Sequence, residues 1–314
     1  MTGRFRWEIL MLAALAGCAT PDPGDRNVVD LMIFAPHPDD ETLGCAGILH
    51  QSLKRGERVK VVIFTSGDGY PAAASLVARK PVDRLTESDF QDLARFRQLQ
   101  SRAAFEALGG DPRDLIFLGY PDGALDQVYR TRGTAPVRQR FTGRSETYAA
   151  AQIDYRSAGC GKAARYVYEE ALADVASLIS DHHPRRICVT AEADRHPDHQ
   201  AAFRFVRDAM DKTGHRGEMD VYVIHGGPQW PWPSGATPGS PYEAHEEKGV
   251  RIPQGVPWPP SRRVALTPEE RAVKQKAIAA QASHLTPEAP ASMLEERNYL
   301  ESFVKSEEVF WRER

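Results

Sequence analysis

Short apolar runs alternate with longer segments whose apolar residues recur at helical spacing through the first two thirds of the chain. The first two runs, VVDLMIF and RVKVVIFT, are continuous and of strand length, as in strands covered on both faces. We predict strands at Val28–Phe34, Arg58–Thr65, Asp114–Leu118, Arg186–Thr190 and Met219–His225, and helices at Glu41–Arg55, Thr86–Leu108, Lys162–Ser180 and Gln200–Met210. This alternation with short connections indicates an α/β fold, with a doubly wound, mostly parallel sheet and helices on both faces.

Two segments interrupt the alternation. Residues 126–161 are polar and rich in arginine, and we expect loops there. The Pro/Trp-rich segment 228–260 includes Trp230, Trp232 and Trp258, and its prolines exclude a continuous helix or strand. Its aromatic side chains either pack on each other or stack on a sugar. Helical patterns return at 267–283 and 291–310, so we expect C-terminal helices within 267–310 and a single domain over 28–314.

The composition narrows the class of protein. The chain has 314 residues, of which 41% are hydrophobic and 26% charged, and this excludes a mainly disordered protein. A formal net charge of −3 predicts no broad basic surface, so we expect no nucleic-acid partner. Cys45, Cys160 and Cys188 show no Cys-x-x-Cys spacing, and we interpret them as small buried residues.

The first residues are typical of a targeting signal. Two arginines precede a short apolar run that ends in Leu15-Ala16-Gly17-Cys18, and the run is too short to span a bilayer. The final four residues resemble the lipobox of bacterial lipoproteins. That resemblance implies a signal peptide at 1–17, lipidation of Cys18 and a tether at 18–27. With Ala19 after the cysteine, it also implies a periplasm-facing protein, held at the outer membrane by its lipid anchor alone.

The tripeptide His-Pro-Asp occurs twice, each time after a predicted strand. The copies are His37-Pro38-Asp39-Asp40-Glu41 and His196-Pro197-Asp198-His199. Composition predicts about 0.05 copies by chance. Doubly wound sheets bind ligands beyond the carboxyl ends of their strands, which is where both copies lie. The repetition therefore predicts a functional site.

Histidine and carboxylate side chains are the ligands of hydrolytic metal sites, which use three protein groups and one water. His37, Asp40 and His199 can face one point from two strand ends, and we predict that they bind the metal. Asp39 then lies beside the ligands as a general base. His196 could stabilise the oxyanion and protonate the leaving amine, and Asp198 could hydrogen-bond a histidine ring nitrogen.

Together the two motifs resemble those of the PIG-L/LmbE-like metal-dependent de-N-acetylases. This resemblance implies a Rossmann-like fold, a zinc ion or sometimes iron, and removal of acetyl groups from substrates that contain N-acetylglucosamine. It implies that His37, Asp40 and His199 bind the metal and that Asp39 is the general base. It also implies that His196 stabilises the oxyanion or acts as the general acid. It also implies substrate contacts from Arg97 and from Asp122 in the segment Gly119–Gly123.

The chain departs from the family pattern at two places near the site. Gln100 stands where an acidic residue is frequent, and Asp194 stands where some relatives have tyrosine. Two other classes of function stay open at this point: a non-catalytic glycan-binding lipoprotein with a structural metal, and a non-haem iron oxygenase. The first would tolerate replacement of Asp39, and the second would depend on oxygen.

Overall fold

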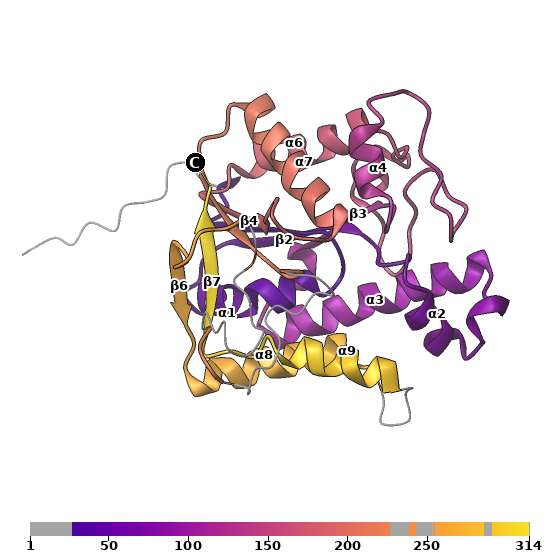
Figure 1. The fold of residues 1–314 in the computed structure, drawn as a ribbon. Coiled ribbons are helices and arrows are strands. Elements are labelled where there is room, and N and C mark those ends of the chain that lie inside the picture. Colours follow the sequence, from indigo (N-terminus) through magenta and orange to yellow (C-terminus); the bar gives the residue numbers. More distant parts are fainter. Residues whose placement is uncertain (1–26, 227–238, 243–252, 254, 286–290, 314) are drawn as a thin grey trace, which may run out of the picture.

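A seven-stranded sheet forms the centre of the molecule (Figure 1), in a computed structural model that describes residues 27–226, 239–242, 253, 255–285 and 291–313. Its strands are β1 (Leu31–Ala35), β2 (Val59–Thr65), β3 (Leu115–Tyr120), β4 (Arg186–Thr190), β5 (Glu218–Tyr222), β6 (Arg262–Ala265) and β7 (Glu307–Arg312). Their order is β3-β2-β1-β4-β5-β7-β6. The first five are parallel, whereas β7 pairs antiparallel with β5 and β6. The predicted signal at 1–17, Cys18, most of the tether, Trp230 and Trp232 lie outside the described residues.

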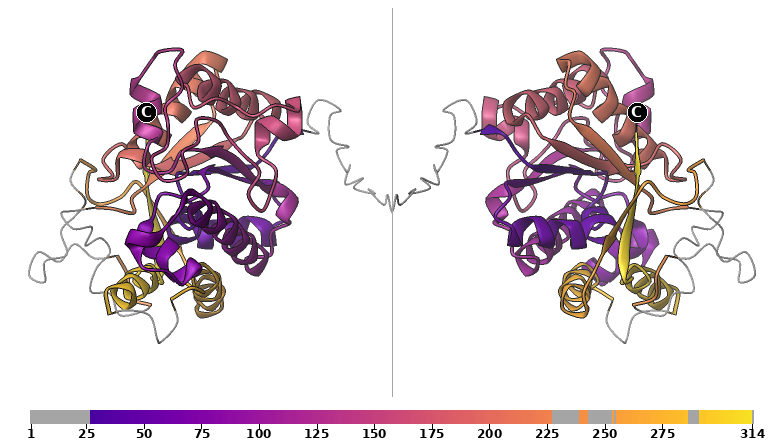
Figure 2. Two further views of the ribbon diagram at one scale, coloured as in Figure 1. Left: turned by 90° about the vertical axis from the view of Figure 1, so that its right-hand side faces the viewer. Right: turned by 90° about the vertical axis from the view of Figure 1, so that its left-hand side faces the viewer.

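Helices cover both faces of the sheet (Figures 1 and 2). One layer holds α1 (Asp40–Lys54), α2 (Pro71–Ala78), α3 (Glu87–Ala107), α8 (Pro268–Gln281) and α9 (Ala291–Glu301). The opposite layer holds α4 (Leu125–Arg130), α6 (Tyr168–His182) and α7 (Pro197–Thr213). The predicted α/β fold with a mostly parallel sheet is therefore confirmed. Among the residues described, we find no helix with the length and apolar character of a membrane span.

The sequence of β1 is continuously apolar because both faces of this strand are covered. Leu31 and Ile33 pack into the cluster that includes α1 and α3 side chains, whereas Met32 and Phe34 pack into the cluster of α6 and α7. All four are buried, because helices exclude water from both faces of this central strand. A period-two polar pattern cannot appear where both faces are buried.

The C-terminal part differs from the sequence prediction. A helix was expected to run to residue 310, but α9 ends at Glu301 and β7 follows. Val309 and Trp311 point into one core cluster and Phe310 into the other, which is the two-residue period of a strand. The prediction of helix over 302–310 was wrong, because sheet pairing of this apolar segment outweighed its local pattern.

Smaller differences concern the first strand, the polar segment and one cysteine. The first strand begins at Leu31 rather than at residue 28, because the Val29 amide donates to the His182 carbonyl outside the sheet. The segment expected to be loops contains α4 and a short helix α5 (Tyr155–Cys160). Cys45 and Cys188 are buried as expected, but Cys160 is exposed at the end of α5.

A buried ion pair ties the C-terminal elements to α1. The Nζ atom of Lys274 in α8 lies 2.7 Å from Oε1 of Glu308 in β7, and both side chains are 1% exposed. Lys274 also donates to the carbonyl of Leu43, and the amides of Gly47 and Ile48 donate to the Glu308 carboxylate. These contacts fix α1, which begins with Asp40, against two elements from the far end of the chain.

We expect Lys274→Met to lower the free energy of unfolding by about 3–5 kcal/mol, because it leaves the Glu308 carboxylate buried without its cation. Urea denaturation followed by circular dichroism measures the change. The matched control is Lys276→Met on the exposed face of the same helix, for which we expect less than about 0.5 kcal/mol. A loss below about 1 kcal/mol for Lys274→Met would show that the pair does not stabilise the fold.

Candidate metal and active site

Both His-Pro-Asp segments lie at the carboxyl ends of two neighbouring strands. His37 and Asp40 follow β1, and His199 lies in the first turn of α7, which follows β4. The strands β1 and β4 pair in parallel, so their carboxyl ends lie side by side at one edge of the sheet. Side chains separated by 162 positions in the chain, such as those of His37 and His199, thereby come into direct contact.

The three predicted ligands bring one atom each to a common point. Nδ1 of His37 lies 3.2 Å from Nε2 of His199, and these nitrogens lie 3.3 Å and 3.1 Å from Oδ2 of Asp40. Ligands bound tetrahedrally at about 2.0–2.1 Å are separated by about 3.3 Å from each other. All three side chains are buried. The three donor atoms therefore have the spacing that a single tetrahedral ion requires, and two imidazoles with one carboxylate suit zinc or iron(II).

Carboxylates hold the other nitrogens of both imidazoles. Nε2 of His37 lies 3.3 Å from Oδ1 of Asp122 and 3.3 Å from Oδ2 of Asp198. Nδ1 of His199 lies 3.2 Å from Oδ2 of Asp194. Burial alone would lower the pKa of His199, but Asp194 and Asp40 raise it to about 9. Such carboxylate–histidine contacts orient the ring and increase its basicity toward a metal.

Asp39 has a backbone conformation that few residues adopt. Its φ is 137° and its ψ is −33°, and its amide donates to Oε2 of Glu41. A non-glycine residue at such a φ is strained, and strain of this kind concentrates at functional sites. Burial raises the pKa of the Asp39 carboxyl to about 7, against the opposing effect of Arg97. A carboxyl group with a pKa near neutrality suits a general base.

His196 caps the N-terminus of α7 and faces the same site. Its Nδ1 accepts a hydrogen bond from the amide of Asp198, so the hydrogen of the neutral ring lies on Nε2. Its ring meets that of His37 edge to face at 4.7 Å between centroids. Burial, followed by the neighbouring imidazoles, lowers the pKa of His196 to about 2. The neutral ring therefore presents an N–H donor, which fits stabilisation of an oxyanion.

The two residues expected to bind substrate both contact other site residues. Nη2 of Arg97 donates to Oδ2 of Asp39 at 2.8 Å and to the carbonyl of Pro38 at 2.7 Å. The Asp122 carboxylate contacts His37 and accepts from the amide of Gly69 at 2.7 Å. Arg97 and Asp122 both line the cavity above the donor triad. In this structure, Arg97 positions the predicted base and Asp122 positions a predicted ligand.

A cavity of about 540 Å³ opens beside the donor atoms. Its lining residues come from the segments that follow the strands, from α1 and α3, and from the C-terminal α9. They are those of His37, Asp39, Asp40, Leu43, Tyr70, Arg97, Asp122, His196, Ile224, His225, Glu295, Glu296, Tyr299 and Leu300, together with Gly69 and Gly123. The cavity therefore gives a small molecule direct access to the triad.

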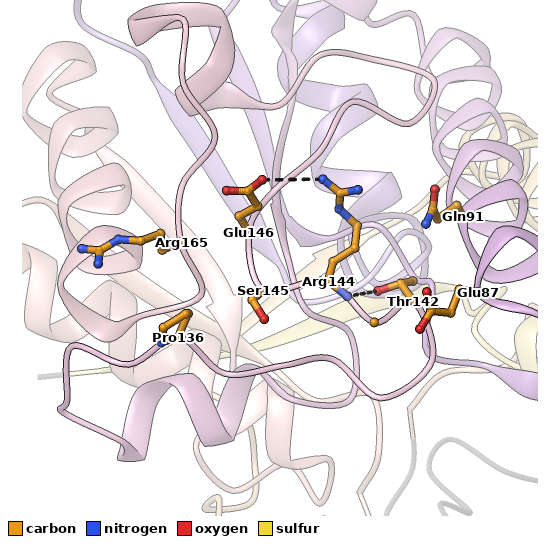
Figure 3. Close-up of a pocket in the computed structure, with 9 residues that line it drawn as sticks. Glu87, Gln91, Pro136, Thr142, Arg144, Ser145, Glu146 and Arg165 are labelled. Atoms are coloured by element: carbon orange, nitrogen blue, oxygen red, sulfur yellow. Dashed lines mark hydrogen bonds and ion pairs between the residues drawn. The ribbon is translucent and has the colours of Figure 1, made fainter.

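A second hollow, of about 520 Å³, lies against the start of α3 and the segment 136–165 (Figure 3). Figure 3 shows Arg144 turned toward Glu146, with 3.9 Å between their charged groups. Of its other charged residues, Glu87 contacts Arg138, and Arg165 contacts Glu170. Its described lining includes no histidine, cysteine or aspartate. The predicted catalytic residues Asp39 and His196 line the first cavity instead.

Sequence analysis missed two residues of the site. Asp194 accepts hydrogen bonds from the amides of His196, Ile224 and His225, in addition to its contact with His199. His225 follows β5, and its ring is tilted by 35° against that of His196, with 5.3 Å between the ring centroids. Its Nδ1 lies 3.3 Å from Oδ1 of Asp194. The strand-end rule that located the two motifs applies to β5 as well, so His225 could have been found in the same way.

Comparisons with known proteins identify the family of this chain. A family model described as PIG-L, GlcNAc-PI de-N-acetylase, matches residues 32–210, which include both motifs. The 1D-myo-inositol 2-acetamido-2-deoxy-alpha-D-glucopyranoside deacetylase of Mycobacterium sp. (strain KMS) is 27% identical over 207 residues, or 65% of this chain. That match spans 57% of the length of the mycobacterial protein.

Two solved structures are similar to this chain over most of its length. The N,N'-diacetylchitobiose deacetylase from Pyrococcus horikoshii has a TM-score of 0.50 and 16% identity, covering 91% of this chain and 84% of that chain. The zinc-inhibited form of teicoplanin deacetylase Orf2 has a TM-score of 0.49 and 18% identity, covering 86% and 90% respectively. Since the family model matches more than half of its residues, the chain belongs to the PIG-L family of GlcNAc-PI de-N-acetylases.

Proposed function

We propose that this protein is a metal-dependent hydrolase that removes the N-acetyl group from an amino sugar related to N-acetylglucosamine. The observation that carries the proposal is the 3.1–3.3 Å spacing of the donor atoms of His37, Asp40 and His199 beside an open cavity. Membership of the PIG-L family supports it, as does the similarity to proteins named as deacetylases of acetylated sugars.

We further propose zinc as the metal, with His37, Asp40 and His199 as its ligands. Two imidazoles and one carboxylate leave a fourth position open, which is typical of catalytic rather than structural zinc sites. Iron(II) accepts the same ligands, so the choice between them is part of the proposal. When bound, such an ion polarises the amide carbonyl and lowers the pKa of a coordinated water.

The residues around the triad then supply the proton transfers. Asp39 accepts a proton from the attacking water while the oxygen of that water bonds to the carbonyl carbon. The N–H of His196 at Nε2 hydrogen-bonds the oxygen that gains negative charge. The C–N bond breaks when the amine nitrogen takes up the proton held by Asp39, and the acetic acid formed then releases the second proton of the water, which leaves acetate and the free amino sugar. Asp122, Asp194 and Asp198 keep the two ligand rings in place throughout.

The test offers metal-loaded protein a panel of N-acetylated sugars, from monosaccharides to oligomers, and measures acetate and free amine. We expect equal amounts of the two products, with no requirement for oxygen. Strict dependence on oxygen would favour the oxygenase alternative. Binding of a sugar with no acetate release, in protein shown to contain one metal per chain, would favour the non-catalytic alternative.

We also propose that Cys18 carries a lipid that holds the protein at the outer membrane, facing the periplasm. The proposal rests on the sequence Leu15-Ala16-Gly17-Cys18 after a basic and then apolar start. Several acyl chains on one cysteine would anchor the chain stably. Incorporation of labelled fatty acid into the protein, and its loss in Cys18→Ser, would test this anchor.

A further inference from the structure

The lining of the active-site cavity carries many negative charges. Five carboxylates lie among its described residues, namely Asp39, Asp40, Asp122, Glu295 and Glu296. The lining includes one guanidinium, that of Arg97, and within the described part of the chain no lysine. Arg97 offsets the charge of Asp39, and a divalent cation at the triad would offset two more, so the charges of Glu295 and Glu296 remain. The cavity therefore stays negative in the metal-loaded protein as well.

The guanidinium of Arg97 already forms hydrogen bonds with groups of the protein. Its Nη2 donates to Asp39 and Pro38, and its Nη1 donates to the carbonyl of Gly67 at 3.4 Å. Only 13% of the side chain is exposed. An anionic ligand would have to compete with the Asp39 carboxylate at 2.8 Å for this cation. Arg97 is therefore poorly placed to compensate a phosphate or a carboxylate on a substrate.

Two of the carboxylates come from α9 and lie apart from the predicted catalytic residues in the chain. Oε2 of Glu296 accepts a hydrogen bond from the hydroxyl of Tyr70 at 2.7 Å. Tyr70 adjoins Gly69, whose amide donates to Asp122, so this contact links α9 to the segment that carries the site. Glu295 is exposed and lines the same cavity.

We propose that these carboxylates select N-acetylated amino sugars whose neighbouring groups are neutral or positively charged, and that they exclude sugars bearing a phosphate or carboxylate. This inference rests on the proposed deacetylase function and adds the charge class of the substrate. Like charges a few ångströms apart in a partly desolvated cavity repel each other strongly, and specificity is commonly built from such repulsion. The same charges attract the ammonium group of the deacetylated product.

The first experiment compares two acetamido disaccharides that differ only by a phosphate monoester on the sugar next to the reacting ring. We expect kcat/KM to favour the neutral compound by at least about tenfold at low salt. The preference should shrink as the salt concentration rises to about 0.5 M, because salt screens these charges. Equal values, or a preference for the phosphorylated compound, would overturn the proposal.

The second experiment removes the charges of α9 one at a time. Glu296→Gln keeps an oxygen that accepts from Tyr70, and Glu295→Gln keeps the size of an exposed side chain. Each should reduce the ratio of the two kcat/KM values several-fold, mainly through KM for the phosphorylated compound. The matched control is Glu301→Gln on the same helix, which contacts Arg297 and lies outside the cavity lining, and it should leave the ratio unchanged.

Calorimetry with non-reacting ligands separates this inference from the proposed function. We expect glucosamine, as its ammonium form, to bind at least about tenfold more tightly than its phosphate ester. This preference without turnover of either disaccharide would contradict the deacetylase proposal and support charge selection. Turnover of both disaccharides without preference, together with equal binding, would contradict charge selection alone.

Discussion

Asp39→Asn is expected to lower kcat for acetate release by about 10³-fold, with the metal still bound. The asparagine side chain is nearly the same size and can still accept the hydrogen bond from Arg97, but it cannot take a proton from water. General-base catalysis contributes about 10²–10⁴-fold in rate, and the strained backbone of Asp39 is typical of a residue held in place at a functional site. Steady-state kinetics with metal-loaded protein measures the loss.

The control for this variant is Asp92→Asn, an exposed position on α3 with the same chemical change. Metal content is measured in both variants, because a lost ion would imitate a lost base. Asp39→Asn with one metal per chain and a rate within about tenfold of the wild type would show that Asp39 is not the base. Metal-loaded wild type that released no acetate would instead favour the non-catalytic alternative.

His199→Gln is expected to abolish metal binding and, with it, activity. The imidazole of His199 is fully buried, contacts Asp40 on one side and Asp194 on the other, and is one of the three proposed metal ligands. With two donors left, we expect bound zinc to fall from about one ion per chain to below about 0.1. Elemental analysis after dialysis against buffered zinc measures this directly.

A thermal readout keeps the prediction for His199 independent of activity. Zinc should raise the Tm of the wild type, because an ion that binds only the folded state stabilises it by mass action. It should leave the Tm of His199→Gln unchanged. The matched control, His50→Gln in α1, removes a half-buried imidazole that contacts the Leu108 carbonyl, and it should keep the zinc-dependent increase. Zinc bound at full stoichiometry by His199→Gln would disprove the proposed triad.

Carboxylates in the site fall into two groups with different consequences. Asp122, Asp194 and Asp198 hold imidazoles, and burial keeps their contacts short and fixed. Glu295 and Glu296 face the cavity from α9 and leave the donor triad free. Replacement of the first group should act on metal affinity, whereas replacement of the second should act on substrate choice. Under these two proposals, catalysis lies in the parallel core and substrate specificity in the C-terminal helix.

The strands of the parallel half could be predicted from the sequence because they are buried on both faces. The segment at 186–190 was predicted with the same bounds that the structure shows, and its central residues are wholly buried. At the C-terminus the same reasoning failed for β7, whose pairing partners β5 and β6 lie far away in the chain. The local pattern of apolar residues indicates that a segment is buried, but it does not indicate which strand or helix the segment packs against.

The sequence by itself determined the alternating strands and helices and the two strand-end motifs, and it supplied the prediction that His37, Asp40 and His199 are the metal ligands. Those features depend on residue type and on neighbours within a few positions. Only the tertiary structure decided that Arg97 faces Asp39, that Asp194 links His199 with His225, and that α9 adds two carboxylates to the cavity. These contacts join elements far apart in the chain, and their distances follow from how the layers pack against the sheet.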